Sequence, residues 1–326
     1  MNRILACILA IAAVHASEAL TESPPTAAWR EQAITIDNGS VRVVADALHG
    51  GRLIAYGPKD GNILQDDTEH PAWIFPGNVH WTGPAGGRFD LGPEEVIPAH
   101  PTLWTGTWTA ERPAPLHIRL TSQPDPAAGV QLVRDFVLDA TGTRLRCTQT
   151  MRNITDRQIR RSYWGRSLVR GGGITLVPLN PDSRFPVGYL TYSGWKTNLI
   201  ALKPKDPAVS IRDGVAIVAP TLDTKLGFDG TAGWIAYLAP GGTMFVKGYS
   251  VHPARRYTGV AGLTASLWSD GNGLLEVEPL GPEEILDPGA SAAFSEDWWL
   301  VPYPTPADPA QVDVREVVNL VTRTRG

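Results

Sequence analysis

The sequence predicts an all-β fold, a large antiparallel β-sandwich that ends in a short helix. Glycine and proline are abundant, with 33 and 28 in 326 residues, and long runs of Ala, Leu, Glu and Lys are missing. Apolar and polar residues alternate with a period of two along many short segments, which is typical of half-buried strands. Hydrophobic residues make up 43% of the chain and charged residues 19%, which suits one sizeable core.

The N-terminal residues predict a signal peptide. Arg3 precedes an apolar run, residues 4–16, that is too short to span a bilayer. Small residues then offer cleavage after Ala16 or after Ala19, so we assign residues 1–19 to the signal peptide and residues 20–32 to a flexible leader. We therefore expect a secreted or periplasmic protein with no membrane insertion after cleavage, since no later segment is apolar for 18 residues.

From residue 33 onward, alternating segments separated by turn residues predict the strands. The expected strands cover residues 33–36, 41–45, 52–56, 103–109, 116–122, 130–138, 144–151, 174–178, 215–219, 234–238, 244–250, 274–277 and 292–300. No composition break divides them, so we expect one domain over residues 33–303, with two smaller sandwiches as the alternative.

Residues 304–326 predict a Pro-rich segment followed by a helix. Asp308 precedes Pro309, the pattern of an N-cap followed by proline in the first turn. Four valines, Val314, Val317, Val318 and Val321, then fall on one helical face that would dock on the domain.

Charge and cysteine content narrow the function classes. The chain carries 29 basic and 33 acidic residues, a net charge of −4, so we expect no nucleic-acid partner. Cleavage of the signal removes Cys7 and leaves Cys147 alone, which we expect to be a buried small hydrophobe rather than a nucleophile. Metal-ligand spacings, a nucleophile elbow and a phosphate-binding glycine loop are all missing, so we expect no metal and no cofactor.

Three stretches together resemble the galactose mutarotase-like (aldose 1-epimerase-like) superfamily, and within it a family of secreted bacterial proteins. The stretches are His49–Leu64 (HGGRLIAYGPKDGNIL), Cys147–Gly173 (CTQTMRNITDRQIRRSYWGRSLVRGGG) and Leu274–Leu300 (LLEVEPLGPEEILDPGASAAFSEDWWL). They cover about a quarter of the chain in the order found in that superfamily. The resemblance implies a β-supersandwich whose concave sheet face binds a sugar.

In aldose epimerases a histidine protonates the ring oxygen and a glutamate removes the proton of the anomeric hydroxyl. The resemblance places site residues on the strand after the Asn-x-Thr-Asp of Asn153–Asp156. This chain departs from the pattern there, because residues 162–166 read Ser-Tyr-Trp-Gly-Arg and contain no histidine. The resemblance therefore leaves the acid of the reaction unassigned.

Glu276 and Glu278 are the best catalytic candidates. Residues i and i+2 of a strand project from the same face, so the two carboxylates would lie side by side, and their repulsion would raise the pKa of one of them. Glu278, which precedes a Pro-Leu-Gly-Pro turn, is the better candidate for the base. The alternative is that both carboxylates face solvent.

Further candidates come from a Gly-rich segment, residues 80–95, which we expect to be a loop. His80 is a candidate for the missing acid, and Trp81 could stack on a sugar ring. Arg88 could hold ring hydroxyls or a carboxylate with its planar guanidinium; the alternative is a solvated arginine after an ordinary turn.

Three more side chains could bind substrate. Trp164 and Arg166 share a strand face at the place where the resemblance puts the site. Lys225 could contact a ligand, although a solvated turn is the favoured interpretation. Trp104 and Trp108 would share a strand face and are assigned to the core rather than to a sugar platform.

The sequence therefore favours a carbohydrate-active protein that binds a mono- or oligosaccharide on the concave sheet face. An aldose epimerase or mutarotase is the catalytic interpretation. A non-catalytic carbohydrate-binding protein and a polysaccharide lyase-like enzyme, in which Arg88 or Arg255 would neutralise a uronate carboxylate, are the alternatives.

Overall fold

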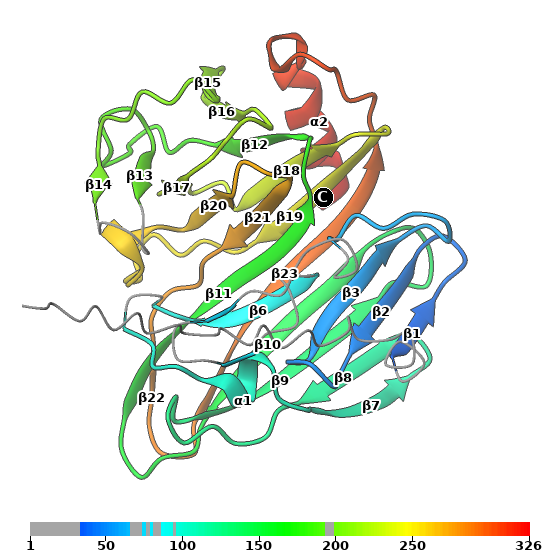
Figure 1. The fold of residues 1–326 in the computed structure, drawn as a ribbon, viewed down its shortest axis with the longest axis vertical. Helices are drawn as coiled ribbons and strands as arrows, with labels where there is room; N and C mark the ends of the chain where they lie inside the picture. The colour runs from blue at the N-terminus through cyan, green and yellow to red at the C-terminus, as the bar shows by residue number, and fades with distance from the viewer. Residues whose placement is uncertain (1–32, 66–73, 76–78, 81–85, 94–95, 193–198) are drawn as a thin grey trace, which may run out of the picture.

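The protein is described from a computed structural model, which covers residues 33–65, 74–75, 79–80, 86–93, 96–192 and 199–326 (Figure 1). The predicted signal peptide and leader lie outside this range, as do Trp81 and the side chain of His80. Strands dominate the described residues, and the expected all-β sandwich with a short C-terminal helix is confirmed. No helix among the described residues is long and apolar enough to cross a membrane.

The first sheet has eleven strands, and every pairing in it is antiparallel. Ten strands follow one another across the sheet, and β22 pairs with β11 off that path. In sheet order these are β1 (Ile34–Asp37), β2 (Arg42–Asp46), β3 (Arg52–Gly57), β6 (Gly87–Gly92), β11 (Ile159–Arg170), β21 (Leu274–Pro279), β20 (Ala265–Ser269), β17 (Lys225–Phe228), β13 (Leu190–Tyr192) and β14 (Ile200–Ala201), with β22 (Glu284–Leu286) beside β11.

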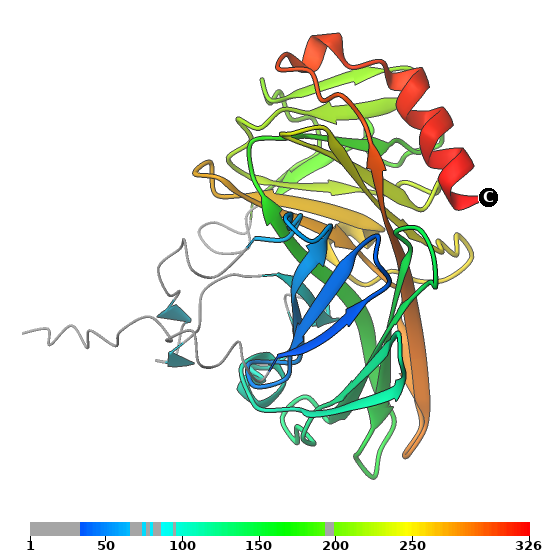
Figure 2. The ribbon, with the colours of Figure 1, turned by 90° about the vertical axis from the view of Figure 1, so that its right-hand side faces the viewer.

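The second sheet has ten antiparallel strands and packs against the first (Figure 2). A separate two-stranded ribbon joins β4 (Ile74–Phe75) to β5 (Val79–His80). In order the second sheet contains β15 (Val209–Arg212), β16 (Val215–Val218), β12 (Ile174–Pro178), β18 (Trp234–Ala239), β19 (Thr243–Tyr249), β23 (Ser291–Pro302), β10 (Leu145–Asn153), β9 (Val130–Leu138), β8 (His117–Thr121) and β7 (Thr109–Ala114).

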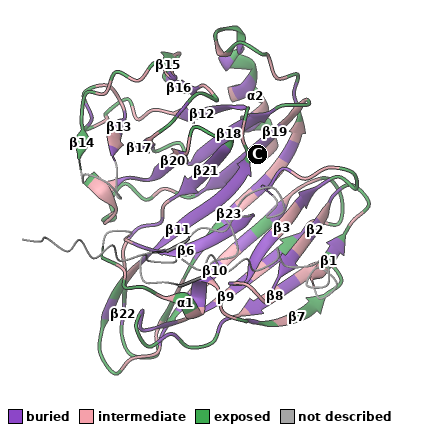
Figure 3. Ribbon diagram, in the orientation of Figure 1, coloured by how far each residue is buried: buried purple, intermediate pink, exposed green. Residues whose placement is uncertain are grey.

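The main core lies between the two sheets. Strands β9, β10 and β23 alternate buried and more exposed residues, as expected for strands with one face in a core. The central strands β6, β11 and β21 are instead buried along most of their length, while the edge strands β7 and β14 are exposed (Figure 3). The first sheet therefore carries two buried faces, and only one of them belongs to the main core.

The C-terminal helix covers part of the outer face of the second sheet. Helix α2 (Val314–Arg325) buries Val314, Val317 and Val321 against β12, β16, β18 and β19, and Val318 packs at the margin. The predicted face is thus correct, but the predicted start is early. Asp308 caps the short 3-10 helix η4 (Pro309–Gln311), and Asp313 caps α2 by accepting the backbone N–H of Glu316.

Three expectations about local structure are wrong. Residues 103–109 do not form one strand, because a short helix, α1 (Pro101–Trp104), precedes β7 and takes Trp104 off the expected strand face. Arg88 does not lie in a loop, since residues 87–92 form β6. Lys225 likewise begins the buried strand β17 rather than a solvated turn. Charged residues obscured the strand pattern in both β6 and β17.

Cys147 is buried, as expected.

A fully buried ion pair joins the two sheets at the centre of the core. Lys247 of β19 lies 2.8 Å from Glu296 of β23, and both side chains are 0% exposed. The Lys247 ammonium also reaches the first sheet, where it donates to the Ser167 hydroxyl and to the Val277 carbonyl at 3.0 Å each. Glu296 accepts from Tyr163 Oη at 2.7 Å and from Trp298 Nε1 at 2.6 Å. Every polar atom of the pair is therefore satisfied.

We expect Lys247→Met to lower the free energy of unfolding by about 3–5 kcal/mol, because it leaves the Glu296 carboxylate buried without its counter-charge. The double variant Lys247→Met/Glu296→Gln should recover part of this loss. Urea denaturation measures both, with Arg160→Gln of the exposed Arg160–Glu283 pair as control, for which a change under about 1 kcal/mol is expected. A loss under 1 kcal/mol for Lys247→Met would contradict the structural role of the pair.

Candidate functional site

Charged and aromatic side chains form a continuous row across the face of the first sheet that points away from the main core. On β6, Phe89 and Leu91 point into the main core, so Arg88 and Asp90 point to the opposite face. Cross-strand partners share a face, and Arg166 and Trp164 of β11 lie opposite Arg88 and Asp90. The predicted pair of Trp164 and Arg166 is therefore on the same face as Arg88.

Strands β21, β17 and β13 extend this row. Leu168, which shares the face of Arg166, lies opposite Glu276, and Glu278 lies two residues further along β21. Trp268 of β20 lies opposite both Glu276 and Lys225, and Lys225 lies opposite Tyr192 of β13. The strand register therefore brings together side chains from six strands, which span residues 87–279 of the sequence.

Glu278 is at the centre of the row. Its side chain is 0% exposed, so the alternative that β21 turns its carboxylates to solvent is excluded. Oε2 accepts the indole N–H of Trp164 at 3.0 Å and lies 3.5 Å from Lys225 Nζ. Oε1 is buried and has no hydrogen-bond partner among the described residues. One oxygen of this carboxylate is thus held in place, while the other has unused capacity for a hydrogen bond.

Burial raises the pKa of Glu278 to about 7, and the neighbouring Glu276 carboxylate adds to the rise. Lys225 and Arg166 oppose it by favouring the charged form. A carboxyl group with this pKa can both accept and donate a proton near neutral pH. The expectation that repulsion between two carboxylates would raise one pKa agrees with the geometry, although burial is the larger cause.

Arg166 is held between two indole rings and two carboxylates. Its guanidinium carbon lies 4.3 Å from the ring centroid of Trp164 and 4.7 Å from that of Trp104. Nη2 donates to Glu276 Oε1 at 3.0 Å, and Nη1 lies 3.6 Å from Asp90 Oδ2. The aromatic faces and the carboxylates together stabilise a guanidinium that is only 9% exposed.

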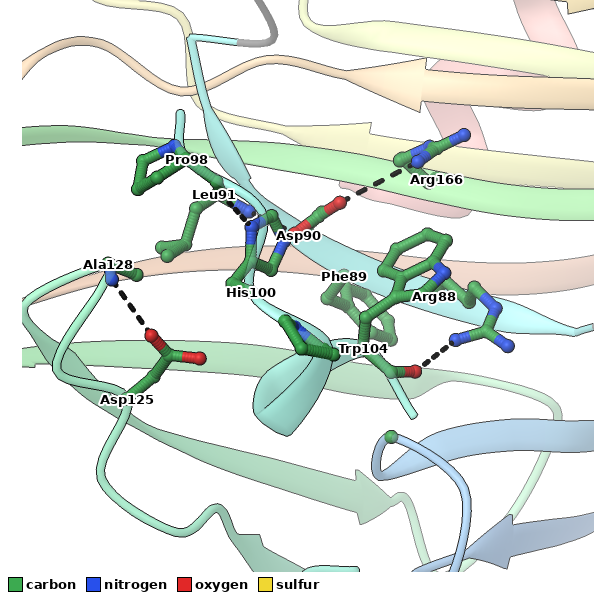
Figure 4. Close-up of polar contacts among 12 residues, drawn as sticks. Arg88, Phe89, Asp90, Leu91, Pro98, His100, Trp104, Asp125, Ala128 and Arg166 are labelled. Atoms are coloured by element: carbon green, nitrogen blue, oxygen red, sulfur yellow. Dashed lines mark hydrogen bonds and ion pairs between the residues drawn. The ribbon is translucent and has the colours of Figure 1, made fainter. Parts of the chain in front are cut away.

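Helix α1 covers one end of the row (Figure 4). Arg88 Nη1 donates to the Trp104 carbonyl at 2.9 Å, and the Arg88 guanidinium stacks on the Trp104 ring at 4.4 Å. Lys225, at the other end, lies 4.8 Å from the Trp164 ring and 5.3 Å from the Tyr192 ring. Trp164 therefore contacts two cations and donates to Glu278.

Two charged residues of this site were missed by the sequence reasoning. Asp90 accepts the backbone N–H of Leu91 at 2.8 Å, and its Oδ1 lies 2.8 Å from His100 Nε2 (Figure 4). His100 Nδ1 lies 2.7 Å from the Pro98 carbonyl. The spacing Arg88-x-Asp90 was a signal for Asp90, but nothing in the sequence around His100 indicates its partner.

The ion pair between Asp90 and His100 lowers the pKa of Asp90 and raises the pKa of His100. Burial works against each charge, but the partner more than compensates, so the pKa of Asp90 falls to about 2 and that of His100 rises to about 9. His100 is therefore a cation at neutral pH. Both of its ring nitrogens already have acceptors, so it positions Asp90 and is not placed to give a proton to a ligand.

A small hollow opens beside Trp164 and Tyr192. It has a volume of about 20 Å³, enough for about one water molecule, and it is also lined by Ser162, Val260 and Leu280. A volume this small is far below that of ordinary small-molecule sites. Among the described residues, no group of three or more His, Cys, Asp or Glu side chains could hold a metal ion.

Comparison with known proteins gives structural matches only. No protein-family model and no curated protein matches the sequence. A galactose mutarotase-like protein from Lactobacillus casei ATCC 334 matches with a TM-score of 0.59 at 12% identity, over 82% of this chain and 100% of that one. The chain has the galactose mutarotase-like fold. This confirms the resemblance seen in the sequence, at the level of fold.

Two further solved structures match over most of the chain. The Slr1438 protein from Synechocystis sp. PCC 6803 matches with a TM-score of 0.56 at 15% identity, over 83% of this chain and 96% of that one. A candidate aldose 1-epimerase from Escherichia coli K12 matches with a TM-score of 0.55 at 14% identity, over 83% and 99%. Because the identities are so low, the candidate site residues are identified from the geometry of this chain alone.

The raised pKa of Glu278 makes stability depend on pH. Between the unfolded value of 4.5 and about 7 the folded protein binds more protons at this site, so the free energy of unfolding falls as pH rises through this window. We expect the stability of the wild type relative to Glu278→Gln to fall by roughly 1–3 kcal/mol from pH 5 to pH 8 in urea denaturation. Glu111→Gln on the exposed strand β7 is the control. A rise over the same range would contradict the assignment.

His100 should make stability depend on pH over a second, separate range. Its folded pKa of about 9 exceeds the ordinary 6.5, so its contribution is complete below pH 6.5 and is lost as pH rises through 9. The stability of the wild type relative to His100→Asn should thus shrink between pH 6.5 and 9, by roughly 2 kcal/mol. In an Asp90→Asn background the same comparison should be flat, and a window that persists there would assign the effect to another group.

Proposed function

We propose that the protein is an aldose epimerase-like enzyme that binds a sugar on the charged face of the first sheet and interconverts its anomers. The observation that carries the proposal is Glu278, a fully buried carboxyl group with a pKa of about 7 and one oxygen without a partner among the described residues. A group of this kind, beside cations and indole rings, is suited to proton transfer on a hydroxylated ligand.

The reaction needs one proton removed and one supplied. Glu278 in its carboxylate form would take the proton of the anomeric hydroxyl, so that the C1–O1 bond becomes a carbonyl as the bond from C1 to the ring oxygen breaks. The ring oxygen must gain a proton at the same time. Lys225, whose ammonium lies 3.5 Å from Glu278, would supply this proton. Rotation about the C1–C2 bond and the reverse transfers then give the other anomer.

The remaining side chains of the row would orient the sugar. Trp164 fixes the Glu278 carboxylate through its indole N–H. Arg166 is fixed in turn by Glu276, and Arg88 by Trp104, so both guanidiniums are preorganised for ring hydroxyls. We also propose that the protein acts outside the cytoplasm, because residues 1–19 have the pattern of a signal peptide.

A non-catalytic sugar-binding protein is the second candidate. It is favoured by the missing histidine at residues 162–166, which leaves proton donation to a lysine. The two candidates share the binding face and differ only in whether anomer exchange is accelerated.

Anomer exchange of freshly dissolved aldoses, followed by NMR, tests the proposal. We expect the wild type to accelerate exchange of at least one aldose, and Glu278→Gln to slow the enzymatic rate by about 10²-fold or more, the usual contribution of a general base. Glu111→Gln should behave as the wild type. Exchange at the buffer rate across a broad panel would eliminate the enzyme, while a sugar-dependent rise in melting temperature would then support the binding protein.

A further inference from the structure

A polar groove lies on the opposite side of the molecule, on the outer face of the second sheet. It has a volume of about 480 Å³, within the range of small-molecule sites and far larger than the hollow beside Trp164. Its lining includes Arg144, Arg146, Asp297, Trp299 and Arg325. All of these residues are independent of the row around Glu278.

The strand register builds the floor of the groove. Arg146 of β10, Asp297 of β23 and Gly248 of β19 lie directly opposite one another on three neighbouring strands. Trp298 points into the main core, so its neighbour Trp299 points out to this face, where it is half-buried. The Trp299 ring passes over Gly248, where an added Cβ would lie 2.9 Å from it. The glycine thus leaves room for the Trp299 ring and for Arg325, whose Nε would lie 3.1 Å from the same Cβ.

Arginines form both walls. Arg146 makes a two-pronged ion pair with Asp297, with 3.0 Å for each bond, and Arg144 Nη2 lies 3.2 Å from the same carboxylate. Arg325, from the last turn of α2, faces them and donates to the Ala232 carbonyl at 3.0 Å. In Figure 2, α2 descends along the outside of the second sheet and ends beside β23.

Guanidinium groups are the main charged groups of the lining. Arg144, Arg146 and Arg325 line the groove together with the carboxylate of Asp297 and the last residue, Gly326, and Arg144 Nη1 also lies 3.6 Å from Asp139 Oδ2 at the edge. Arg144 also lies 5.9 Å from the Trp299 ring. A guanidinium pairs with a carboxylate or sulfate through two parallel hydrogen bonds, and an indole face stacks on the apolar face of a pyranose.

We propose that this groove binds an anionic saccharide unit, with the carboxylate of a uronic acid paired to the arginines and its pyranose ring on Trp299. The site is separate from the proposed epimerase face and does not depend on it. It would hold an acidic polysaccharide against the second sheet while the first sheet stays accessible to its own ligand.

Calorimetric titration of the full-length protein at low salt tests the proposal, with trigalacturonate as probe. We expect binding that weakens about tenfold or more in Trp299→Ala and in Arg146→Gln, and that weakens with added salt. Arg152→Gln is the matched control, because Arg152 lies exposed on the outer face of the same strand, roughly 20 Å along β10 from Arg146. Glu278→Gln should bind trigalacturonate as the wild type does.

Several outcomes would overturn the proposal. Equal binding of galactotriose would remove the role of the carboxylate. Equal binding of sodium sulfate, unchanged in Trp299→Ala, would leave a simple anion site without saccharide recognition. A loss of binding in Glu278→Gln, with Trp299→Ala unaffected, would move the acidic sugar to the first sheet. No binding of trigalacturonate would exclude the groove as a uronate site, whatever the result for anomer exchange.

Discussion

The buried charges on one face of the first sheet impose the main constraint on this protein. Arg88, Asp90, Arg166, Lys225, Glu276 and Glu278 are all 9% exposed or less. A charge in so dry a place is costly unless an opposite charge or an aromatic face compensates it. The strand register supplies this compensation, because it places Arg166 between two carboxylates and two indoles, and Lys225 beside Glu278.

An indole ring or a carboxylate lies against each of the three cations of the row, whereas Glu278 has the like charge of Glu276 as well as Lys225 among its neighbours. Burial and the Glu276 carboxylate raise the pKa of Glu278 to about 7, although Lys225 and Arg166 act in the opposite direction. Its Oε1 has no hydrogen-bond partner among the described residues. Directly behind it, Lys247 donates to the Val277 carbonyl, between Glu276 and Glu278, and so ties this strand to the second sheet. The rigid core therefore holds in place a carboxyl group whose pKa lies near neutral pH. This is the combination expected of a preorganised site.

The sequence predicted the sandwich well, because strands with one buried face alternate visibly. Residues 130–138 were predicted as a strand with the bounds of β9, and the helical valines were placed on the correct face. Charged strands were harder to predict. Arg88 and Lys225 lie on strands that are buried on both faces, where a charged residue breaks the apolar run that would signal burial.

Part of the site also depends on contacts that no local pattern contains. Glu276, Glu278, Trp164 and Arg166 were predicted from their spacing and from the superfamily resemblance, and the structure brings them together. Trp104 was assigned to a strand, since the turn of α1 is only four residues long. His100 pairs with Asp90 across ten residues of chain, and nothing in the residues between them indicates the contact.

A crystal structure grown with a saturating aldose would test the central claim most directly. The account predicts a pyranose ring in contact with Trp164, with its anomeric hydroxyl within about 3.2 Å of Glu278, the range of an ordinary hydrogen bond, and with the loop at Val260 displaced outward. The account would be contradicted if Glu278, Arg166 and Lys225 were found apart or facing solvent, or if the sugar occupied only another part of the molecule.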